Sequence, residues 1–400
     1  MQLDRLRSTA GLDVHGKRVL VRADLNVPVE DGKVNDATRL ERLLPGLRDL
    51  ARRGARVIVI SHFGRPKGSR DPRFSLRPVA DKLAELLGQP VAFAEDCVGE
   101  AAERTVGSLR PHQIAVLENL RFHNGEENND PAFAQRLAAL GDIFVNDAFS
   151  AAHRAHASTS AIARLLPSYA GPLLLAEIAA LSSVLEKPTR PTAAVIGGAK
   201  VSSKIELLQN LVGKVDSLII GGGMANTFLL AEGVEVGKSL AEPDHAQTAR
   251  TILRAAKARH CEVLLPEDVV VAERLAPATP WQVVATRQTP VDAMILDVGP
   301  KTVAHYGSVI EHAKTLVWNG PLGAFEIAPF GAGTFALARR AAELTEAGRL
   351  LSVAGGGDTV AALNAAGVAH AFSYVSTAGG AFLEWLEGRE LPGIVALAAG

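Results

Sequence analysis

Cysteine is scarce in this sequence, which excludes the structures that depend on it. Only two cysteines, Cys97 and Cys261, occur among 400 residues, and they lie far apart without a CxxC partner. A disulfide framework and a cysteine-bound metal are therefore not expected. So little cysteine fits the reducing cytoplasm, where we expect the protein to reside.

The sequence also lacks an excess of one charge and any long hydrophobic run. Its formal net charge is −1, whereas proteins that coat nucleic acid or anionic membranes usually carry a basic excess. Its apolar stretches have the length of strands and are bounded by Gly, Pro or charged residues, so none spans a bilayer. Residues 1–11 contain no apolar core of a secretory signal. We therefore expect small-molecule substrates and neither nucleic acid nor membrane as a partner.

What the sequence does contain is an alternation of short β-branched runs with longer amphipathic runs. Such alternation predicts βαβ units with parallel sheets. A chain of 400 residues is longer than a single domain with one hydrophobic core usually is, so we expect two domains. We predict an α/β protein of two Rossmann-like, three-layer domains joined by a helix and a hinge. The predicted segments are an N-terminal domain at 1–170, a connecting helix at 171–188, a C-terminal domain at 189–380 and a segment at 381–400 that packs back on the first domain. Asp31-Gly32 predicts a hairpin turn near the first strand.

In the first half, cationic residues follow successive strand-like runs or open the helix after them. They are Arg22, Arg39, His62, Arg65, Arg121 and Arg154. Ligands of open α/β sheets bind beyond the carboxyl ends of the strands, and arginine binds phosphate and carboxylate in bidentate fashion. Any one of these arginines taken alone is more often a solvated charge or an ion-pair partner. Several at successive strand ends favour a site for a small, multiply charged anion.

In the second half, glycine-rich turns replace the arginines. Gly197-Gly198 precede Lys200 and Lys204, which we expect to lie four residues apart on one face of an opening helix. Glycines let backbone N–H groups approach phosphate, and a helix N-terminus favours anions. Further glycine triplets occur at 221–223 and 355–357. A single glycine-rich turn often serves only to make a tight connection between a strand and a helix. Three such turns in one half of the chain, with lysines following the first, favour nucleotide binding.

Asp358-Thr359 follow the last triplet at a predicted helix start. Thr359 is expected to donate to phosphate, and Asp358 is the best-placed carboxylate for Mg²⁺, which prefers oxygen ligands and shared phosphates. The alternative is that Asp358 only caps the helix.

Two other patterns match known motifs incompletely. Residues 233–239 resemble a Walker A loop but are one residue short and follow a helix-like run. Residues 221–226 nearly match the dinucleotide fingerprint, but Asn226 replaces the third glycine, so a nicotinamide enzyme is a weak interpretation.

Through nearly its whole length the chain resembles phosphoglycerate kinases. The motifs that carry the resemblance occur in the family's order: VRADLNVP at 21–28, SHFGRP at 61–66, LENLRF at 117–122, NDAFS at 146–150, GGAKVS at 197–202, GGGMAN at 221–226, WNGPLGAFE at 318–326 and GGGDT at 355–359. The family's usual leucine in the second motif is Phe63 here. This substitution changes packing and does not alter any charged residue of the motif.

The resemblance implies reversible, Mg²⁺-dependent phosphoryl transfer between 1,3-bisphosphoglycerate and ADP in glycolysis, by a monomer. It assigns Arg22 and Lys200 to the transferred group, Asp358 to Mg²⁺ and Glu326 to the ribose. The residues implied for 3-phosphoglycerate are Asp24, Leu25, Asn26, Arg39, His62, Phe63, Gly64, Arg65, Arg121 and Arg154. Those implied for the nucleotide are Lys204, Asn319, Glu326, Gly356, Gly357, Asp358 and Thr359.

This reaction fits the side chains present. Its nucleophiles, a phosphate oxygen or a carboxylate, are already ionised near neutral pH, so no general base is required. Catalysis then depends on positioning and charge neutralisation, and the two half-sites predict domain closure. A kinase for another small carboxylate, a non-catalytic nucleotide-binding protein and a redox enzyme remain the alternatives.

Overall fold

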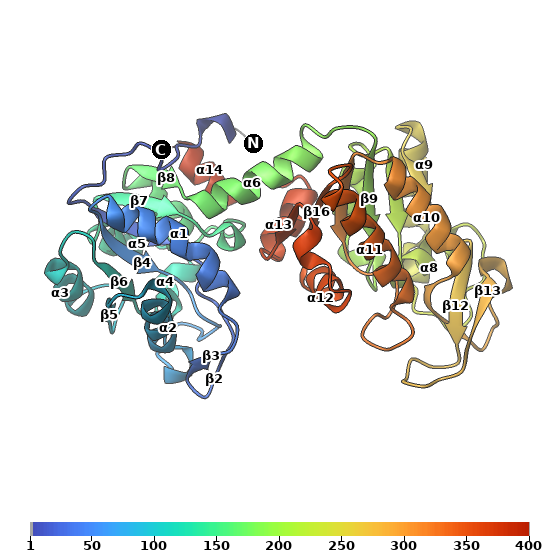
Figure 1. Ribbon diagram of the computed structural model, residues 1–400, viewed down its shortest axis with the longest axis horizontal. Coiled ribbons are helices and arrows are strands. Elements are labelled where there is room, and N and C mark those ends of the chain that lie inside the picture. The colour runs from blue at the N-terminus through green and yellow to red at the C-terminus, as the bar shows by residue number, and fades with distance from the viewer. Residues whose placement is uncertain (1–2, 400) are drawn as a thin grey trace. The chain divides into compact units, whose positions relative to one another are not determined.

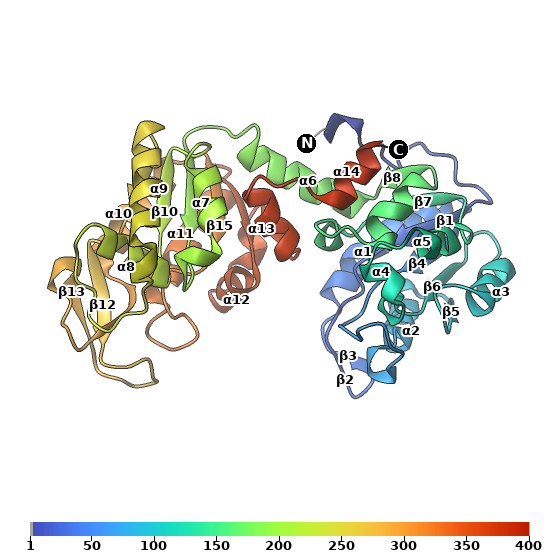
Figure 2. The same cartoon turned by 180° about the vertical axis from the view of Figure 1, so that it is seen from behind.

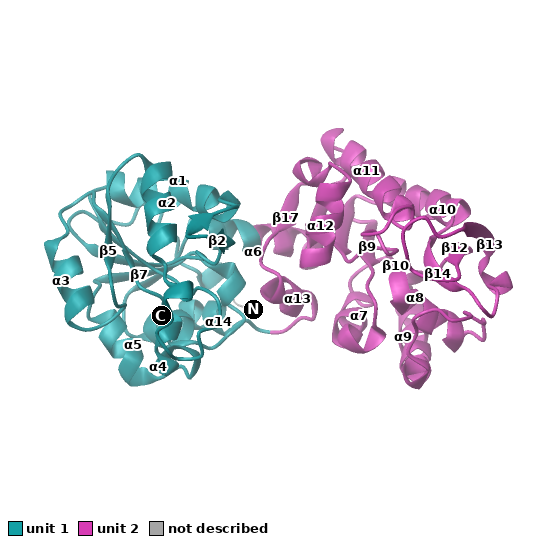
Figure 3. Ribbon diagram, turned by 90° about the horizontal axis from the view of Figure 1, so that it is seen from below, with its two compact units in different colours: residues 1–178, 390–400 teal, residues 179–389 magenta. Residues whose placement is uncertain are grey.

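The computed structural model describes residues 3–399, which form two compact units. Unit 1 contains residues 1–178 and 390–400, and unit 2 contains residues 179–389 (Figure 3). Each unit is built on its own parallel sheet with helices on both faces, which confirms the predicted α/β class. No helix of the described residues is long and apolar enough to cross a membrane.

Unit 1 is built on a six-stranded parallel sheet of order β5-β6-β4-β1-β7-β8. Its strands are β1 (Arg18–Arg22), β4 (Arg56–Ile60), β5 (Val91–Ala94), β6 (Ile114–Leu117), β7 (Ile143–Asn146) and β8 (Ser168–Ala170). The four central strands are nearly continuous runs of buried residues, as expected for strands covered on both faces. A short hairpin of β2 (Val29–Glu30) and β3 (Lys33–Val34) confirms the turn predicted at Asp31-Gly32.

The helices of unit 1 cover both faces of this sheet (Figures 1 and 3). They are α1 (Thr38–Arg52), α2 (Arg77–Leu87), α3 (Glu100–Ser108), α4 (Asn124–Glu127), α5 (Pro131–Ala138) and α14 (Pro392–Ala399). On one face, α1 and α2 bury leucines such as Leu40, Leu47 and Leu83 against β1, β4 and β7. On the other face lie α4, α5 and α14 (Figure 3).

Unit 2 repeats the plan with the sheet order β11-β10-β9-β15-β16-β17. Its strands are β9 (Thr192–Ile196), β10 (Ser217–Ile220), β11 (Glu262–Leu264), β15 (Thr315–Asn319), β16 (Leu351–Gly355) and β17 (Tyr374–Ser376). Its helices are α7 (Ile205–Leu211), α8 (Gly222–Ala231), α9 (Ala246–Ala258), α10 (Pro300–His312), α11 (Ala332–Glu346), α12 (Gly357–Ala365) and α13 (Gly380–Leu386). Figure 2, from behind, shows α7, α8 and α9 in front of this sheet, on the face opposite α11.

Unit 2 also contains a small antiparallel sheet that the simple alternation of strands and helices does not predict. It has the order β13-β12-β14 and consists of β12 (Asp268–Ala272), β13 (Trp281–Ala285) and β14 (Met294–Val298). β13 is exposed along most of its length, so it lacks the buried run by which the other strands are recognised.

The boundary between the units lies within α6 (Pro172–Leu185), at residues 178 and 179, whereas the connecting helix is predicted at 171–188. At the C-terminus, α14 lies in unit 1, where the Gly393 N–H donates to the Ala152 carbonyl at 2.8 Å. Helix α13, which the predicted final segment includes, lies in unit 2, where Asn210 Nδ2 donates to the Leu386 carbonyl at 2.6 Å.

Candidate active site

In unit 1, the predicted anion-binding residues follow four neighbouring parallel strands. Arg22 ends β1 and is paired in register with Ile60 of β4 and Asn146 of β7. His62 lies just beyond β4, and Arg121 lies in the 3₁₀ turn η3 (Leu120–Phe122) after β6. The parallel register therefore collects residues from distant parts of the chain at one edge of the sheet.

Arg22 is a buried charge, with 1% of its surface exposed. Its Nε donates to Ser158 Oγ at 2.9 Å, and its Nη2 lies 3.0 Å from His62 Nδ1. Ser158 in turn donates from Oγ to the fully buried Glu126 at 2.6 Å. Burial lowers the pKa of Arg22, while the charge of Glu126 opposes that shift. Arg22 is thus held inside unit 1 by a chain of hydrogen bonds that ends on a buried carboxylate.

The two histidines near Arg22 are held neutral. Burial, followed by repulsion from Arg22, lowers the pKa of His62 well below its usual value. Burial and Arg121 lower the pKa of His156 to about 3. Both rings can therefore accept or donate hydrogen bonds near neutral pH without adding positive charge to the arginine cluster.

Asp24, Asn26 and Arg39 form a second network beside β1. Arg39 Nη1 lies 3.2 Å from Asp24 Oδ2 and donates to the Asn26 carbonyl at 2.8 Å. Ser150 Oγ also donates to Asp24 Oδ2, at 2.6 Å, and the Gly64 N–H donates to Asn26 Oδ1 at 2.9 Å. These bonds fix the loops after β1 and β4 relative to each other.

Arg121 connects this network to the loop after β6. It is 4% exposed, its Nη1 donates to the Gly64 carbonyl at 2.7 Å, and its Nε lies 3.1 Å from Glu127 Oε1. Burial lowers the pKa of Arg121, and the nearby Arg154 and Arg65 add to that shift. Arg65 is exposed and Arg154 is partly exposed, so their charges are accessible to an anion.

Leu25 and Phe63 are buried and contribute backbone contacts. The Leu25 N–H donates to Ser61 Oγ at 3.0 Å. The Phe63 N–H and carbonyl bond to Asn119 Oδ1 and Nδ2 at 3.0 and 2.6 Å. Backbone groups of these two residues therefore help to position the polar loops, and the side chains present no charge.

In unit 2, glycine-rich turns follow β9 and β10 and touch each other. The Met224 N–H donates to the Gly198 carbonyl at 3.0 Å, and a Cβ on Gly222 would lie 2.6 Å from the same oxygen. Gly222 also has a φ of +67°, which a side chain would disfavour. Glycine is therefore required here by space and by backbone conformation.

Lys204 points back toward the ends of β9 and β15. Its Nζ donates to the Gly197 carbonyl and to Asn319 Oδ1, both at 2.6 Å. Burial lowers its pKa to about 8, and the carboxylate of Asp358 opposes that shift. Asn319 Nδ2 donates to the Gly355 carbonyl at 2.7 Å, so one amide connects the loops after β9, β15 and β16.

The expected stacking of Lys200 and Lys204 on one helical face is wrong. Residues 201–203 form a 3₁₀ turn, η7, and α7 begins only at Ile205, after Lys204. Lys200 is exposed, whereas Lys204 is partly buried against the strand ends. The 3₁₀ turn changes the angle between the two side chains, because it has fewer residues per turn than an α-helix.

The last glycine triplet leads into α12. Gly356 is the N-cap of this helix with a φ of +99°, and Gly357 is its first residue, so Asp358 is not the cap but lies in the first turn. Thr359 is 2% exposed, and its Oγ1 accepts from the Gly320 N–H at 2.7 Å. Its hydroxyl thus connects the first turn of α12 to the loop after β15.

A cavity of about 410 Å³ lies beside these turns. Its lining includes Glu326 and Asp358 together with backbone of the first two glycine turns. Most of its wall is apolar and includes Leu240, Met294, Leu296, Val298 and Leu322. An apolar slot with glycine turns at its side has the composition expected for a base and its phosphates.

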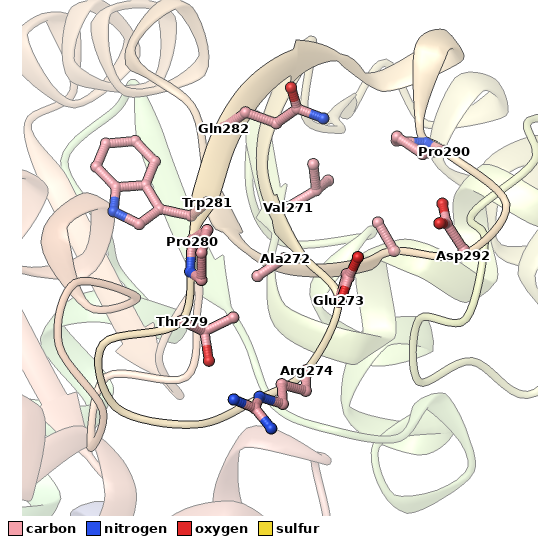
Figure 4. A pocket seen from close by; sticks show the side chains of 11 residues that line it. Val271, Ala272, Glu273, Arg274, Thr279, Pro280, Trp281, Gln282, Pro290 and Asp292 are labelled. Atoms are coloured by element: carbon pink, nitrogen blue, oxygen red, sulfur yellow. The ribbon is translucent and has the colours of Figure 1, made fainter.

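A second cavity, of about 450 Å³, lies on the small antiparallel sheet (Figure 4). Carboxylates of Glu273 and Asp292 line it together with Arg274 and the exposed Trp281. None of the predicted site residues contributes to its lining.

The comparison with known protein families identifies the chain. The family model described as phosphoglycerate kinase matches residues 9–389. The chain belongs to the phosphoglycerate kinase family.

Individual phosphoglycerate kinases resemble the chain over nearly its full length. The protein of Methylorubrum extorquens is 62% identical over 386 residues, 96% of each chain. That of Rhodospirillum centenum is 62% identical over 388 residues, covering 97% of this chain and 98% of the other. The solved structure of phosphoglycerate kinase from Coxiella burnetii has a TM-score of 0.92 at 44% identity and covers 98% of this chain and 99% of the other.

Membership in the phosphoglycerate kinase family makes the chain an enzyme, a phosphotransferase with a carboxyl group as acceptor. The nicotinamide enzyme and the non-enzymatic binding protein are thereby excluded.

Sequence reasoning misses several residues that the structure places beside those of the phosphoglycerate kinase motifs. Glu126 and Ser158 carry no recognisable signal, because their contact with Arg22 depends on elements far apart in sequence. Asn226 occurs in the GGGMAN motif and in the imperfect fingerprint but is given no role from sequence, and it lines the cavity of unit 2.

The residues at this cavity fit a magnesium ion held with a nucleotide. Asp358 offers a carboxylate at the cavity wall, close enough to Lys204 to influence its pKa. Asp297 also lines the cavity, but its two oxygens accept from the Val298 and Gly333 N–H groups at 2.9 Å each. Asp358 is therefore the carboxylate better able to contact a hard cation.

Proposed function

We propose that this enzyme transfers a phosphoryl group reversibly between 1,3-bisphosphoglycerate and ADP, giving 3-phosphoglycerate and ATP in glycolysis. The observation that carries the proposal is the division of its polar residues. Unit 1 gathers arginines around neutral histidines, and unit 2 offers an apolar cavity with glycine turns. A small carboxylate-phosphate fits the first set, and a nucleotide fits the second.

In this proposal, 3-phosphoglycerate binds to the residues beyond β1, β4, β6 and β7. Arg65 and Arg154 are accessible cations for its phosphate, while Asp24 and Asn26 hold the loop. The neutral state of His62 suits this role because a neutral ring donates a hydrogen bond without the cost of burying another charge.

The nucleotide binds with its base in the apolar cavity and its phosphates toward the glycine turns. Lys204 and Asn319 organise the loops under the phosphates, and Glu326 lies at the cavity wall for the ribose. When Mg²⁺ is bound through Asp358, it neutralises charge on the phosphates. Gly356 and Gly357 allow the backbone at the start of α12 to approach them.

No proton transfer is required, so catalysis depends on positioning and on charge. Lys200 is exposed next to the glycine turn and can reach the transferred group, whereas Arg22 is buried. We propose that Arg22 acts on the transferred group after its hydrogen bonds to Ser158 and His62 exchange for bonds to the substrate. Closure of the two domains brings these residues to one phosphoryl group and excludes water that would hydrolyse an acyl phosphate.

A coupled assay with the purified protein tests the proposal. We expect ADP production from ATP that requires both 3-phosphoglycerate and Mg²⁺, and we expect none with acetate or aspartate as the acceptor. Equal rates with another small carboxylate would assign a different substrate. Binding of ADP without turnover would contradict the proposal.

A further inference from the structure

Glu126 is a fully buried carboxylate near Arg22, and the proposed mechanism assigns it no task. It lies in α4, and its side chain is joined to Arg22 through the hydroxyl of Ser158. We propose that Glu126 is a positioning residue for Arg22. It fixes Ser158 as a hydrogen-bond acceptor and supplies the counter-charge that holds the guanidinium at the end of β1, from where Arg22 reaches the transferred group. This inference rests on the role proposed for Arg22 in phosphoryl transfer.

The orientation of the Ser158 hydroxyl is set by Glu126. The Ser158 N–H donates to Glu126 Oε2 at 3.0 Å, and the Ser158 hydroxyl donates to Oε1 at 2.6 Å. A hydroxyl has one hydrogen and two lone pairs, so a hydroxyl that donates to Glu126 can only accept from Arg22. The 2.9 Å bond from Arg22 Nε to Ser158 Oγ therefore depends on Glu126 accepting at both of its oxygens.

Glu126 also supplies the negative charge that acts most strongly on Arg22. Burial lowers the pKa of Arg22, and the charge of Glu126 opposes this shift more than that of Asp24 does. Asp24 Oδ2 is already paired with Arg39 at 3.2 Å and accepts from Ser150 Oγ at 2.6 Å. Because Arg22 and Glu126 are both buried, little water screens the attraction between them.

The other contacts of Arg22 cannot replace this charge. Its Nη1 donates to the Ala23 carbonyl, and its Nη2 lies 3.0 Å from Nδ1 of His62, whose ring is held neutral. Without the charge of Glu126, the guanidinium would be a buried cation among neutral partners, which is costly. We therefore expect Arg22 to shift from its position, and a shift of about 1 Å in a reacting group is enough to slow catalysis.

A double-mutant cycle of Glu126→Gln and Arg22→Ala tests the inference. Glutamine has nearly the shape of glutamate, but it lacks the charge, and its amide nitrogen cannot accept from Ser158. In the wild type we expect Glu126→Gln to lower kcat by about tenfold and to leave KM for 3-phosphoglycerate and ATP within about twofold. In Arg22→Ala, the same substitution should change kcat by less than about twofold, because the group that Glu126 positions is absent.

Glu118→Gln is the matched control. Glu118 is 4% exposed, and it accepts from the Ser75 hydroxyl at 2.7 Å and from the Leu76 N–H at 2.8 Å. It thus resembles Glu126 in its burial and its hydrogen bonds, but the segment that it holds is the start of α2. We expect any effect of Glu118→Gln on kcat to be the same in the wild type and in Arg22→Ala.

Equal losses of kcat from Glu126→Gln in the wild type and in Arg22→Ala would overturn the inference, because they would indicate a structural role. An unchanged kcat in the wild-type background would overturn it as well. If circular dichroism shows that Glu126→Gln does not fold, Ser158→Ala takes its place in the cycle, and equal losses there would again overturn the inference. If Arg22→Ala itself keeps the wild-type kcat, the proposed role of Arg22 fails, a result distinct from equal losses.

Discussion

At the scale of single residues, unit 1 contains two buried groups of opposite charge that are joined through a hydroxyl and do not contact each other in a direct ion pair. Arg22 and the fully buried Glu126 are connected through Ser158, whose hydroxyl accepts from one and donates to the other. Burial raises the pKa of Glu126, while Arg22 opposes that shift. Each charge therefore makes the burial of the other less costly.

Replacing Arg22 tests its proposed role at the transferred group. We expect Arg22→Ala to lower turnover by on the order of 10²–10³, because a preorganised charge is lost, with a much smaller effect on 3-phosphoglycerate binding. Steady-state kinetics and calorimetry measure the two effects separately. Ser158→Ala is the control for the hydrogen bond alone, and equal losses of turnover and binding in Arg22→Ala would contradict the assignment.

The pKa of Lys204 predicts a pH dependence for ADP binding. Because burial lowers this pKa to about 8, Lys204 loses its charge as the pH rises through that value. Loss of a positive charge near the phosphates should weaken ADP binding progressively above about pH 8. In Lys204→Arg, which keeps its charge, calorimetry at pH 7 to 10 should show no such decline; an identical decline would remove Lys204 from the phosphate site.

At the scale of elements, helix starts are fixed by residues from neighbouring strands. Asp147 follows β7, and its Oδ1 accepts from the Leu173 and Leu174 N–H groups of α6 at 2.7 and 3.1 Å. Gly171 is required beside it, because a Cβ there would collide with the Asp147 carboxylate. The bond anchors the start of α6, the helix within which the boundary between the units lies.

We expect Asp147→Ala to destabilise unit 1 by about 1–3 kcal/mol, because two buried N–H groups lose their acceptor. Asp147→Asn should stay within about 1 kcal/mol of the wild type, since one amide oxygen can accept both bonds. Urea denaturation followed by circular dichroism measures the difference. Equal losses in the two variants would show that the negative charge, not the acceptor, stabilises the helix start.

Removing residues 390–400 tests the assignment of α14 to unit 1. Ile394 and Leu397 of this helix are buried, so its loss would expose to solvent the part of unit 1 that covers them. Unit 2 would keep all of its own residues. All three tryptophans, Trp281, Trp318 and Trp385, lie in unit 2. We therefore expect the truncation to lower the melting temperature of the circular dichroism transition of unit 1, while the tryptophan fluorescence transition stays close to that of the wild type.

At the scale of the whole molecule, the residues assigned to the phosphoryl group lie in different units. Arg22 belongs to unit 1, and Lys200 belongs to unit 2. Each unit has its own core, so each ligand should bind to its unit without the other, and transfer should require both.

Small-angle scattering should detect the closure that this division implies. We expect the radius of gyration to fall when 3-phosphoglycerate, Mg²⁺ and a non-hydrolysable ATP analogue are all present, and to change less with either substrate alone. Lys204→Met, which should weaken nucleotide binding and leave 3-phosphoglycerate binding unchanged, is the control. No compaction with both substrates would contradict domain closure.

The sequence by itself determined the two parallel α/β sheets and the family. Buried strands are continuous apolar runs, and the motifs stand directly after them, so both are visible in local sequence. The antiparallel sheet was missed because its exposed strand β13 lacks this pattern.

Only the tertiary structure decided how the side chains meet. It separated Lys200 from Lys204, buried Arg22 against Ser158 and bonded Lys204 to Asn319 at the end of another strand. Such contacts join residues that are distant in sequence, and burial then sets their charge and hydrogen bonding. Local sequence patterns therefore identify which residues follow the strands, but packing determines what each of them can do.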